Sequence, residues 1–234
     1  MRLLLLAGFG ALGLFLLIRG MFSSSVAAVL VGCVLLMITL VLVLSRIRLV
    51  RQLNRLELDG PHLAGQTVTY RPVGETVAPE FHAPPGFHAV ERRAFLGHGR
   101  DTFERAADRI RRWEVKTRAG FRVIRVGDHG SFFSDGPVAS MENAVIRFGP
   151  VRETVTVVRV VDEPRRRGFA YGTLPRHPLR GEEAFLAEWH DDDRVEFVVR
   201  SMSKPRDPSG WLWFPLLLIA QQFFLRRYLR ALVE

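Results

Sequence analysis

The segment EEAFLAEWHDDDRVEFVVRS, residues 182–201, alternates between apolar and polar side chains on either side of a short acidic break. Side chains two residues apart in a β-strand point to the same side of the sheet. One side of this segment carries Glu183, Phe185, Ala187, Trp189, Val195, Phe197, Val199 and Ser201. The break HDDDR, residues 190–194, is typical of a turn. We therefore expect an antiparallel hairpin whose mainly apolar face is covered by another element.

The covering element is predicted at the C-terminus, in SGWLWFPLLLIAQQFFLRRYLRALVE, residues 209–234. Its apolar centre, residues 211–220, is too short to cross a hydrocarbon core of about 30 Å. Polar side chains collect on one side of the second half, so the segment is expected to form a long helix that packs on the sheet. Trp211 and Trp213 near its start leave a re-entrant or interfacial membrane helix as the alternative.

The sequence before the hairpin predicts further strands and one amphipathic helix. Residues 100–113 place apolar side chains at helical spacing, with Asp101 as the predicted cap. The segments expected to form strands are residues 67–74, 88–97, 121–126, 151–161 and 168–174. Several antiparallel strands followed by a long helix indicate an α+β domain.

Two apolar runs, residues 3–18 and 26–44, precede this domain and are separated by a short polar break. The second run is long enough to cross a bilayer and the first is slightly shorter, so residues 1–46 are predicted to form a two-helix transmembrane hairpin. Residues 47–63 would then be a basic linker beside the membrane, and residues 64–234 the helix-and-sheet domain.

The charges flanking the two runs predict how the hairpin is oriented. Arg46, Arg48, Arg51 and Arg55 follow the second run, whereas the break contains only Arg19. By the positive-inside rule, we expect a multi-pass protein of the cell membrane with its C-terminal domain in the cytoplasm. Processing as a signal peptide or lipoprotein, suggested by LVGC at residues 30–33, is the alternative. The chain, however, stays apolar for eleven residues beyond that motif.

The net charge of +9 does not indicate a nucleic-acid partner. Residues 1–55 hold six of the 33 basic residues and no acid, which leaves 27 basic against 24 acidic residues in the remainder. The arginine run at residues 165–167 lacks the interleaved aromatic side chains of a nucleic-acid surface. Because residues 1–46 are predicted to anchor the chain in a membrane, membrane lipids are the expected partners. Only Lys116 and Lys204 are lysines, a bias typical of a GC-rich bacterial genome.

No metal or cofactor site is predicted. The single cysteine, Cys33, lies in an apolar run, and the seven histidines show no pair at zinc-ligand spacing with a further ligand to complete a site. The glycine-rich residues 127–136 lack the features of a phosphate loop or a dinucleotide-binding turn, and no serine lies in a nucleophile elbow.

The segment YGTLPRHPLRGEEAF, residues 171–185, is expected to be a stiff corner between two strands, because proline fixes φ and glycine permits a sharp reversal. By alternation Glu183 points to the apolar side and Glu182 away from it. A carboxylate on an apolar side needs a partner or a raised pKa. Either Glu183 pins the corner, through the loop amides or an arginine, or it orients the polar head of a ligand; catalysis with Tyr171 or His177 is a third possibility.

Three stretches resemble uncharacterised protein family 0548, which is grouped with the START-like helix-grip proteins. They are RPVGETV at residues 71–77, VVDEPRRRGFAYGTLPRHPLRGEEAF at residues 160–185 and FLRRYLRAL at residues 224–232. The resemblance covers roughly residues 65–232 and departs from the family pattern at Arg176, where glycine is usual. It implies an antiparallel sheet wrapped on a long C-terminal helix around an apolar cavity, and it brings no established activity.

Together these features predict a membrane-anchored helix-grip domain that binds a hydrophobic or amphipathic small molecule, or a lipid, in its cavity. The residues expected to contact this ligand are Tyr171, His177, Glu183, Phe185, Trp189 and Phe197. Two alternatives are an enzyme that acts on a lipid-like substrate in the same cavity and a scaffold with a filled interior. A cavity of several hundred Å³ would favour the ligand-binding functions over the scaffold.

Overall fold

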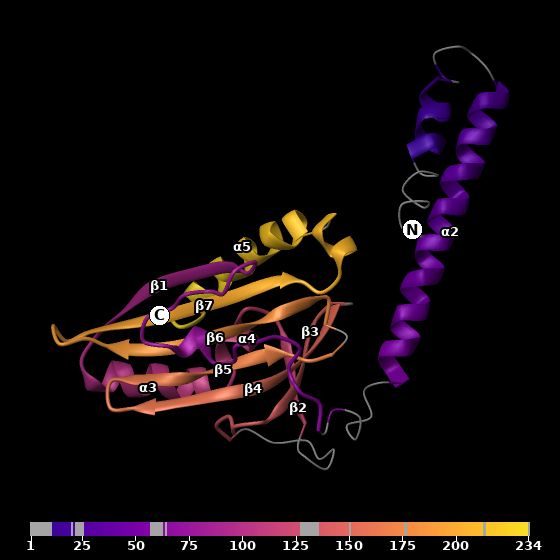
Figure 1. The fold of residues 1–234 in the computed structure, drawn as a ribbon. Coiled ribbons are helices and arrows are strands. Elements are labelled where there is room, and N and C mark those ends of the chain that lie inside the picture. Colours follow the sequence, from indigo (N-terminus) through magenta and orange to yellow (C-terminus); the bar gives the residue numbers. More distant parts are fainter. Residues whose placement is uncertain are drawn as a thin grey trace. The chain divides into compact units, whose positions relative to one another are not determined.

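The computed structural model divides the chain into two compact units, residues 1–58 and 59–234 (Figure 1). The described residues are 11–19, 21, 26–56, 63, 65–126, 136–149, 151–175, 177–212 and 214–233. The division falls within the basic linker predicted at residues 47–63. Each unit is described here by itself.

The N-terminal unit contains two helices, one over residues 11–19 and α2 over Val26–Leu56. They approach closely at Gly32, where an added Cβ would lie 2.7 Å from the backbone nitrogen of Leu17. None of the helices in the described part of the chain is long and apolar enough to cross a membrane. In its described residues, 11–19, 21 and 26–46, the predicted hairpin is thus a pair of contacting helices, while its transmembrane character is not supported.

A single antiparallel sheet of seven strands forms the centre of the second unit, in the order β1-β7-β6-β5-β4-β3-β2. The strands are β1 His88–His98, β2 Arg122–Val126, β3 Asn143–Phe148, β4 Val151–Glu163, β5 Arg166–Thr173, β6 Leu179–Trp189 and β7 Arg194–Pro205. Strands β6 and β7 form the predicted hairpin, with Phe185 opposite Val199 and Glu183 opposite Ser201. The alternation of residues 182–201 therefore predicted both the pairing and the apolar face.

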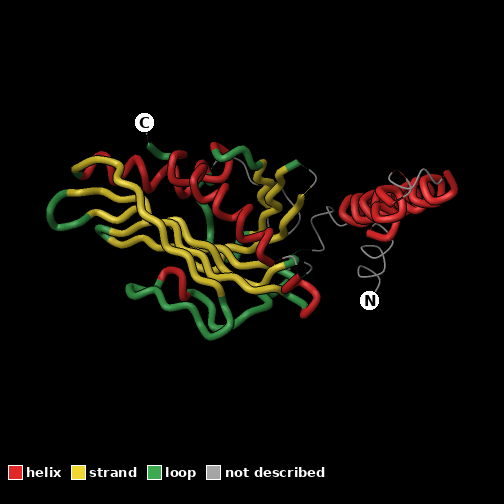
Figure 2. Tube along the Cα trace, turned by 90° about the horizontal axis from the view of Figure 1, so that it is seen from above, coloured by secondary structure: helices red, strands yellow, loops and turns green. Residues whose placement is uncertain are grey.

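The helices collect on one side of the strands, and a segment made mostly of loop lies on the other side (Figure 2). They are α3 Arg100–Arg111, α4 Glu114–Arg118 and α5 Phe214–Ala231, with the short 3₁₀ helix η3 Pro208–Leu212 before α5. Asp101 lies in the first turn of α3, but the cap position is Gly99, so the predicted side-chain cap is wrong. The C-terminal helix packs on the sheet as predicted, and this confirms the α+β helix-grip architecture.

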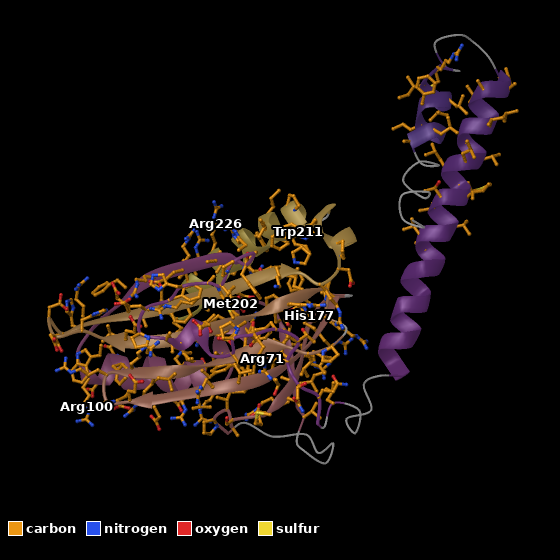
Figure 3. All side chains as sticks on the ribbon, in the orientation of Figure 1. Arg71, Arg100, His177, Met202, Trp211 and Arg226 are labelled. Carbon is orange, nitrogen blue, oxygen red and sulfur yellow. The ribbon has the colours of Figure 1, made fainter. Side chains whose placement is uncertain are left out.

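Buried aromatic and aliphatic side chains fill most of the space between helices and sheet. The largest of them are Trp113, Phe103, Phe169, Phe185, Phe197 and Ile110. Leu225 and Tyr228 of α5 join this cluster, as does Leu232 directly after the helix. Three large apolar side chains of η3 and α5 remain more than half exposed, namely Trp211, Ile219 and Phe223. Trp211 is labelled in Figure 3.

Residues 66–87, which we call the strap, cover the outer face of the sheet and include the 3₁₀ helix η2 Glu75–Val77. Val77 packs there on a small buried cluster of Val161, Leu186 and Val198. The strand predicted at residues 67–74 is wrong, since residues 67–68 have no regular secondary structure and residues 69–74 form bends. Pro72 has no amide hydrogen to give to a ladder, and Gly74 has a φ of 94°, which ends an extended conformation.

Candidate functional site

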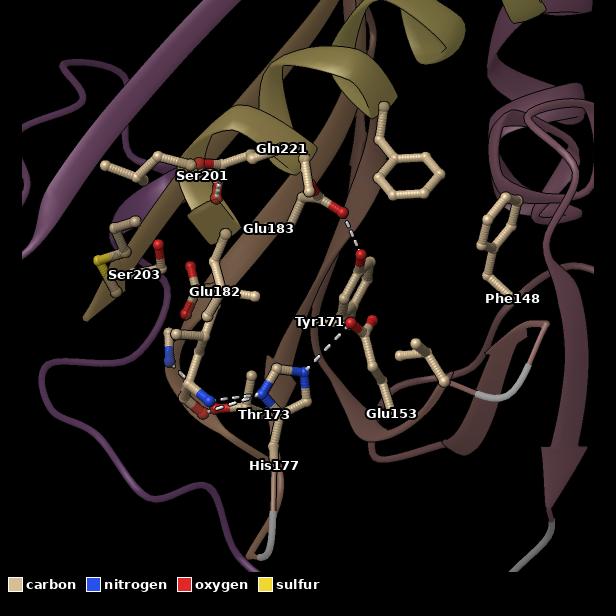
Figure 4. A pocket seen from close by; sticks show the side chains of 18 of the residues that line it. Phe148, Glu153, Tyr171, Thr173, His177, Glu182, Glu183, Ser201, Ser203 and Gln221 are labelled. Carbon is tan, nitrogen blue, oxygen red and sulfur yellow. Dashed lines mark hydrogen bonds and ion pairs between the residues drawn. The ribbon is translucent and has the colours of Figure 1, made fainter. Parts of the chain in front are cut away.

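A cavity of about 250 Å³ lies between α5 and the inner face of the sheet (Figure 4). Its apolar wall includes Phe214, Leu217, Leu218 and Phe224 of the C-terminal helix. The strands and α4 supply a wall of titratable and hydroxyl side chains, namely Lys116, Glu153, Tyr171, His177, Glu183, Ser201 and Ser203. The cavity is consequently amphipathic, because its apolar wall faces a wall of charged and polar side chains.

The corner between β5 and β6 holds His177 at the cavity wall, where it is 6 % exposed. Its backbone amide donates to the carbonyl of Leu174, and its Nδ1 lies 3.0 Å from both the amide nitrogen and the carbonyl oxygen of Leu179. The hydroxyl of Thr173 accepts from the amide of Gly181 across the same corner. These short-range bonds fix the imidazole in place, as the proline- and glycine-rich sequence predicted.

Lys116 is the most enclosed cation of the cavity, with only 3 % of its surface exposed. Its Nζ lies 2.8 Å from Glu183 Oε2 and donates to the hydroxyl of Tyr228 at 2.6 Å. Four aromatic rings surround the ammonium, with centroids 4.5–5.6 Å away: Phe121, Tyr171, Phe185 and Tyr228. A cation at this distance from ring faces is attracted by their quadrupoles, so the aromatic surroundings offset part of the cost of burying the charge.

The carboxylate of Glu183 links this lysine to Tyr171, whose hydroxyl donates to it. Burial, and next the negative charge of Glu183, raise the pKa of Tyr171 well above its ordinary value. Burial likewise raises the pKa of Tyr228. Both phenols therefore stay protonated at neutral pH, with the Tyr171 hydroxyl donating to Glu183 and the Tyr228 hydroxyl accepting from Lys116. The inward direction predicted for Glu183 is correct, but its partners are a lysine and a tyrosine instead of loop amides or an arginine.

Glu153 and His177 form a second polar pair on the cavity wall, with 3.8 Å between Glu153 Oε1 and His177 Nε2. Burial acts to raise the pKa of Glu153, yet the hydrogen bond and charge of His177, helped by Lys116, outweigh it and leave this pKa below its ordinary value. The carboxylate is ionised at neutral pH as a result. The charged wall thus contains two carboxylates and one ammonium next to an imidazole.

Glu182, the neighbour of Glu183, points to the opposite side of the sheet and holds the strap. Its two oxygens accept hydrogen bonds from the hydroxyl of Tyr70, the amide of Gly74, and both the amide and hydroxyl of Thr76. Gly172 lies opposite it on β5, and the absence of a side chain there leaves room for the tyrosine hydroxyl. Glu182, predicted only to point outward, thus fixes the strap on the outer face of the sheet.

Of the predicted ligand contacts, Tyr171, His177 and Glu183 lie in the cavity wall. Phe185 and Phe197 are instead fully buried in the core, since the helices pack directly on this part of the sheet. Trp189 lies further along β6, stacked on Phe103 with 5.9 Å between ring centroids. These last three residues are not among those that line the cavity.

Sequence reasoning missed Lys116, Glu153, Tyr228 and Gln221 as cavity residues. One signal was present: lysine occurs only at positions 116 and 204, against 31 arginines, and Lys116 lies in a short helix between apolar segments. Its partner is 67 positions away, too far for any local pattern to reveal. Among the described residues, no group of three potential metal ligands comes together.

The family model described as "Domain of unknown function (DUF1990)" matches residues 69–231. The chain belongs to the DUF1990 family. This match includes the strap from residue 69 on, all seven strands and α5 up to its last residue, so both sides of the sheet are part of the family domain. Residues before 69 lie outside it.

Relatives of this DUF1990 chain carry the family name that the sequence motifs suggested. A UPF0548 protein of Deinococcus radiodurans is 44 % identical over 81 residues, which cover 35 % of this chain and 41 % of that protein. A UPF0548 protein of Arabidopsis thaliana is 26 % identical over 160 residues, covering 64 % of this chain and 73 % of that protein. The resemblance to uncharacterised protein family 0548 is confirmed.

A solved structure supports the architecture of the DUF1990 domain. The hypothetical protein jhp0584 from Helicobacter pylori superimposes with a TM-score of 0.50 at 12 % identity, over 73 % of this chain and 98 % of that one. At this identity the likeness concerns the fold alone.

Proposed function

We propose that the cavity binds a compact amphipathic small molecule whose polar group faces the Lys116–Glu183 pair. The observation that carries this proposal is the hollow between α5 and the sheet, which the surrounding core does not fill. Binding sites for small molecules combine an apolar wall with a few convergent polar groups. This cavity has both, on opposite sides.

The size of the cavity narrows the class of ligand. An apolar cavity of about 150 Å³ can hold benzene, and pockets for drug-sized ligands start at about 300 Å³. With about 250 Å³, the space suits one substituted ring or a short branched chain. A complete diacyl lipid is too large for it, so we favour a small molecule over the lipid that the sequence also suggested.

Filling the cavity should abolish this binding. Leu218 lines the cavity, whereas the next residue, Ile219, is 67 % exposed on the same helix. We expect Leu218→Trp to weaken binding of p-cresol, a probe with one ring and one hydroxyl, by at least tenfold in NMR titrations, while Ile219→Trp leaves it unchanged. If the wild type co-purifies with a compound, mass spectrometry of organic extracts should find less of that compound in Leu218→Trp and an unchanged amount in Ile219→Trp. Equal affinity of both variants for the probe would rule out the cavity as its site.

An enzymatic function in the same cavity is the second candidate. It is favoured by the density of titratable side chains on one wall, where Lys116, Glu183, Tyr171, Glu153 and His177 all border the ligand space. Such groups can accept or donate protons to a bound substrate. Replacing Glu183 by glutamine removes the carboxylate with little change of shape. Retained binding together with lost turnover would indicate an enzyme, whereas lost binding would indicate a positioning role.

We also propose that the N-terminal unit associates with the cell membrane and that the domain lies on its cytoplasmic side. Large apolar side chains of α2 such as Leu30, Met37 and Leu40 are more than half exposed, and arginines follow the second apolar run. The full chain should then sediment with membranes and resist extraction by carbonate, whereas a chain starting at residue 59 should not. Recovery of the full chain in the soluble fraction would contradict this placement.

A further inference from the structure

A second hollow, of about 340 Å³, lies on the outer face of the sheet between the strap and the paired ends of β6 and β7. It is lined by Val68, Thr69, Tyr70, Arg71, Arg180 and Lys204. Arg180 alternates along β6 with Leu179 and Gly181, which line the cavity on the inner face. The outer hollow is therefore a separate site, on the opposite side of the sheet from the proposed ligand cavity.

Three basic residues line this hollow. Arg180 and Lys204 are direct cross-strand partners, and like charges at such positions destabilise a sheet. Arg71 is added to them from the strap. Within the described part of the chain, no carboxylate forms an ion pair with any of these three side chains. The uncompensated charge is a cost to the fold that a bound anion would remove.

The nearest acid on the same face of β6 is Glu182, two residues from Arg180. Its oxygens are already used, because they accept the hydrogen bonds from Tyr70, Gly74 and Thr76 that hold the strap. This carboxylate therefore fixes the wall of the hollow instead of pairing with the arginines. It also sets the position of Arg71, which follows Tyr70 directly.

Two buried polar atoms at the hollow have no hydrogen-bond partner, namely Nε of Arg180 and the hydroxyl of Thr69. Buried donors in folded proteins are nearly always paired, so two such atoms without a partner, on residues that line the hollow, are consistent with an acceptor supplied by a ligand after a small movement of these side chains. Lys204 is held close by, with its Nζ 4.3 Å from the centroid of Phe87. Two guanidinium groups, an ammonium and a hydroxyl form a donor set suited to the oxygens of a phosphate group.

We propose that this outer hollow is a phosphate-binding site, formed by Arg71, Arg180, Lys204 and Thr69. The arginines donate to phosphate oxygens, and the lysine contributes a third positive charge. The phosphate group can belong to a soluble phosphorylated compound or to the headgroup of a phospholipid. Both sources share the chemistry that these side chains recognise.

The first test measures thermal unfolding of the full chain with and without inorganic phosphate. At a phosphate concentration a hundredfold above Kd, the wild type should gain about 5–10 °C in Tm relative to chloride at equal ionic strength. Arg180→Gln should weaken phosphate binding about ten- to a hundredfold, because it removes charge-assisted hydrogen bonds. Without phosphate this variant should be as stable as the wild type or more so, since the repulsion with Lys204 is gone.

Arg100→Gln is the matched control, because Arg100 is exposed on α3 and lies far from Arg71 in the view of Figure 3. It makes the same change of charge and should keep the full phosphate response. An equal response of Arg100→Gln and Arg180→Gln, or no response of the wild type, would overturn the proposal.

Vesicles separate the two sources of phosphate. Phosphatidic acid exposes a phosphate monoester, whereas phosphatidylglycerol carries its phosphate as a diester. If the site takes a lipid headgroup, the wild type should bind phosphatidic acid vesicles at least tenfold more tightly than Arg180→Gln does. Phosphatidylglycerol vesicles should distinguish the two proteins much less. If the site takes a soluble compound, both proteins bind both vesicles alike while inorganic phosphate still distinguishes them.

Discussion

Replacing Glu182 by alanine should lower the free energy of unfolding by about 3–5 kcal/mol, because four buried or partly buried donors lose their acceptor at once. The carboxylate is 3 % exposed, and Thr76 beside it is fully buried. Water cannot easily replace the lost oxygens there. For a chain of this size the loss corresponds to a fall in Tm of about 10 °C.

Urea unfolding followed by circular dichroism would measure this effect. Glu163→Ala is the control, since this glutamate is exposed at the end of β4 and its ion pair with Arg166 is long, at 3.9 Å. It should cost less than about 1 kcal/mol. Glu182→Gln should fall between the two, because its amide keeps one acceptor but turns an N–H toward the donors of the strap. A loss below 1 kcal/mol for Glu182→Ala would mean that the strap is not held by this residue.

The strap also explains where reading the sequence failed. Residues 67–74 contain β-branched and aromatic residues, a pattern that favours a strand, but the strap is fixed by a carboxylate more than a hundred positions further along the chain. No local pattern carries that information. The hairpin of β6 and β7, by contrast, was predictable because its pairing is local and a one-residue slip would turn the apolar side chains of one strand to the other face.

The cavity was predictable in part for the same reason. Alternation along β6 gave the directions of Glu182 and Glu183 correctly, but their partners come from distant segments. The same alternation suggested Phe185 and Phe197 as ligand contacts, because it shows which side chains face inward. It does not show where the helices leave an open space. Only the packing of α3 and α5 determines which inward residues are covered and which border the hollow.

Lys116→Met should also destabilise the protein by about 3–5 kcal/mol, because it leaves the carboxylate of Glu183 without its cation in a largely apolar interior. Glu183→Gln alone should cost less, since the aromatic rings around the ammonium still attract it. The double variant Lys116→Met/Glu183→Gln contains neither buried charge. The double variant should therefore lose about 1–3 kcal/mol less free energy of unfolding than the sum of the losses of the two single variants.

This double-mutant cycle tests whether the charged wall of the cavity acts as one unit. Arg118→Met on the same short helix is the control. Arg118 is half exposed, pairs with Glu114 and donates to the carbonyl of Ala231, which Arg109 also reaches. Its loss of stability should stay below about 1 kcal/mol. Strict additivity of the two cavity substitutions would show that Lys116 and Glu183 do not depend on each other. A coupled pair would instead be held in fixed geometry before any ligand arrives, and this is what a preorganised binding or catalytic site requires.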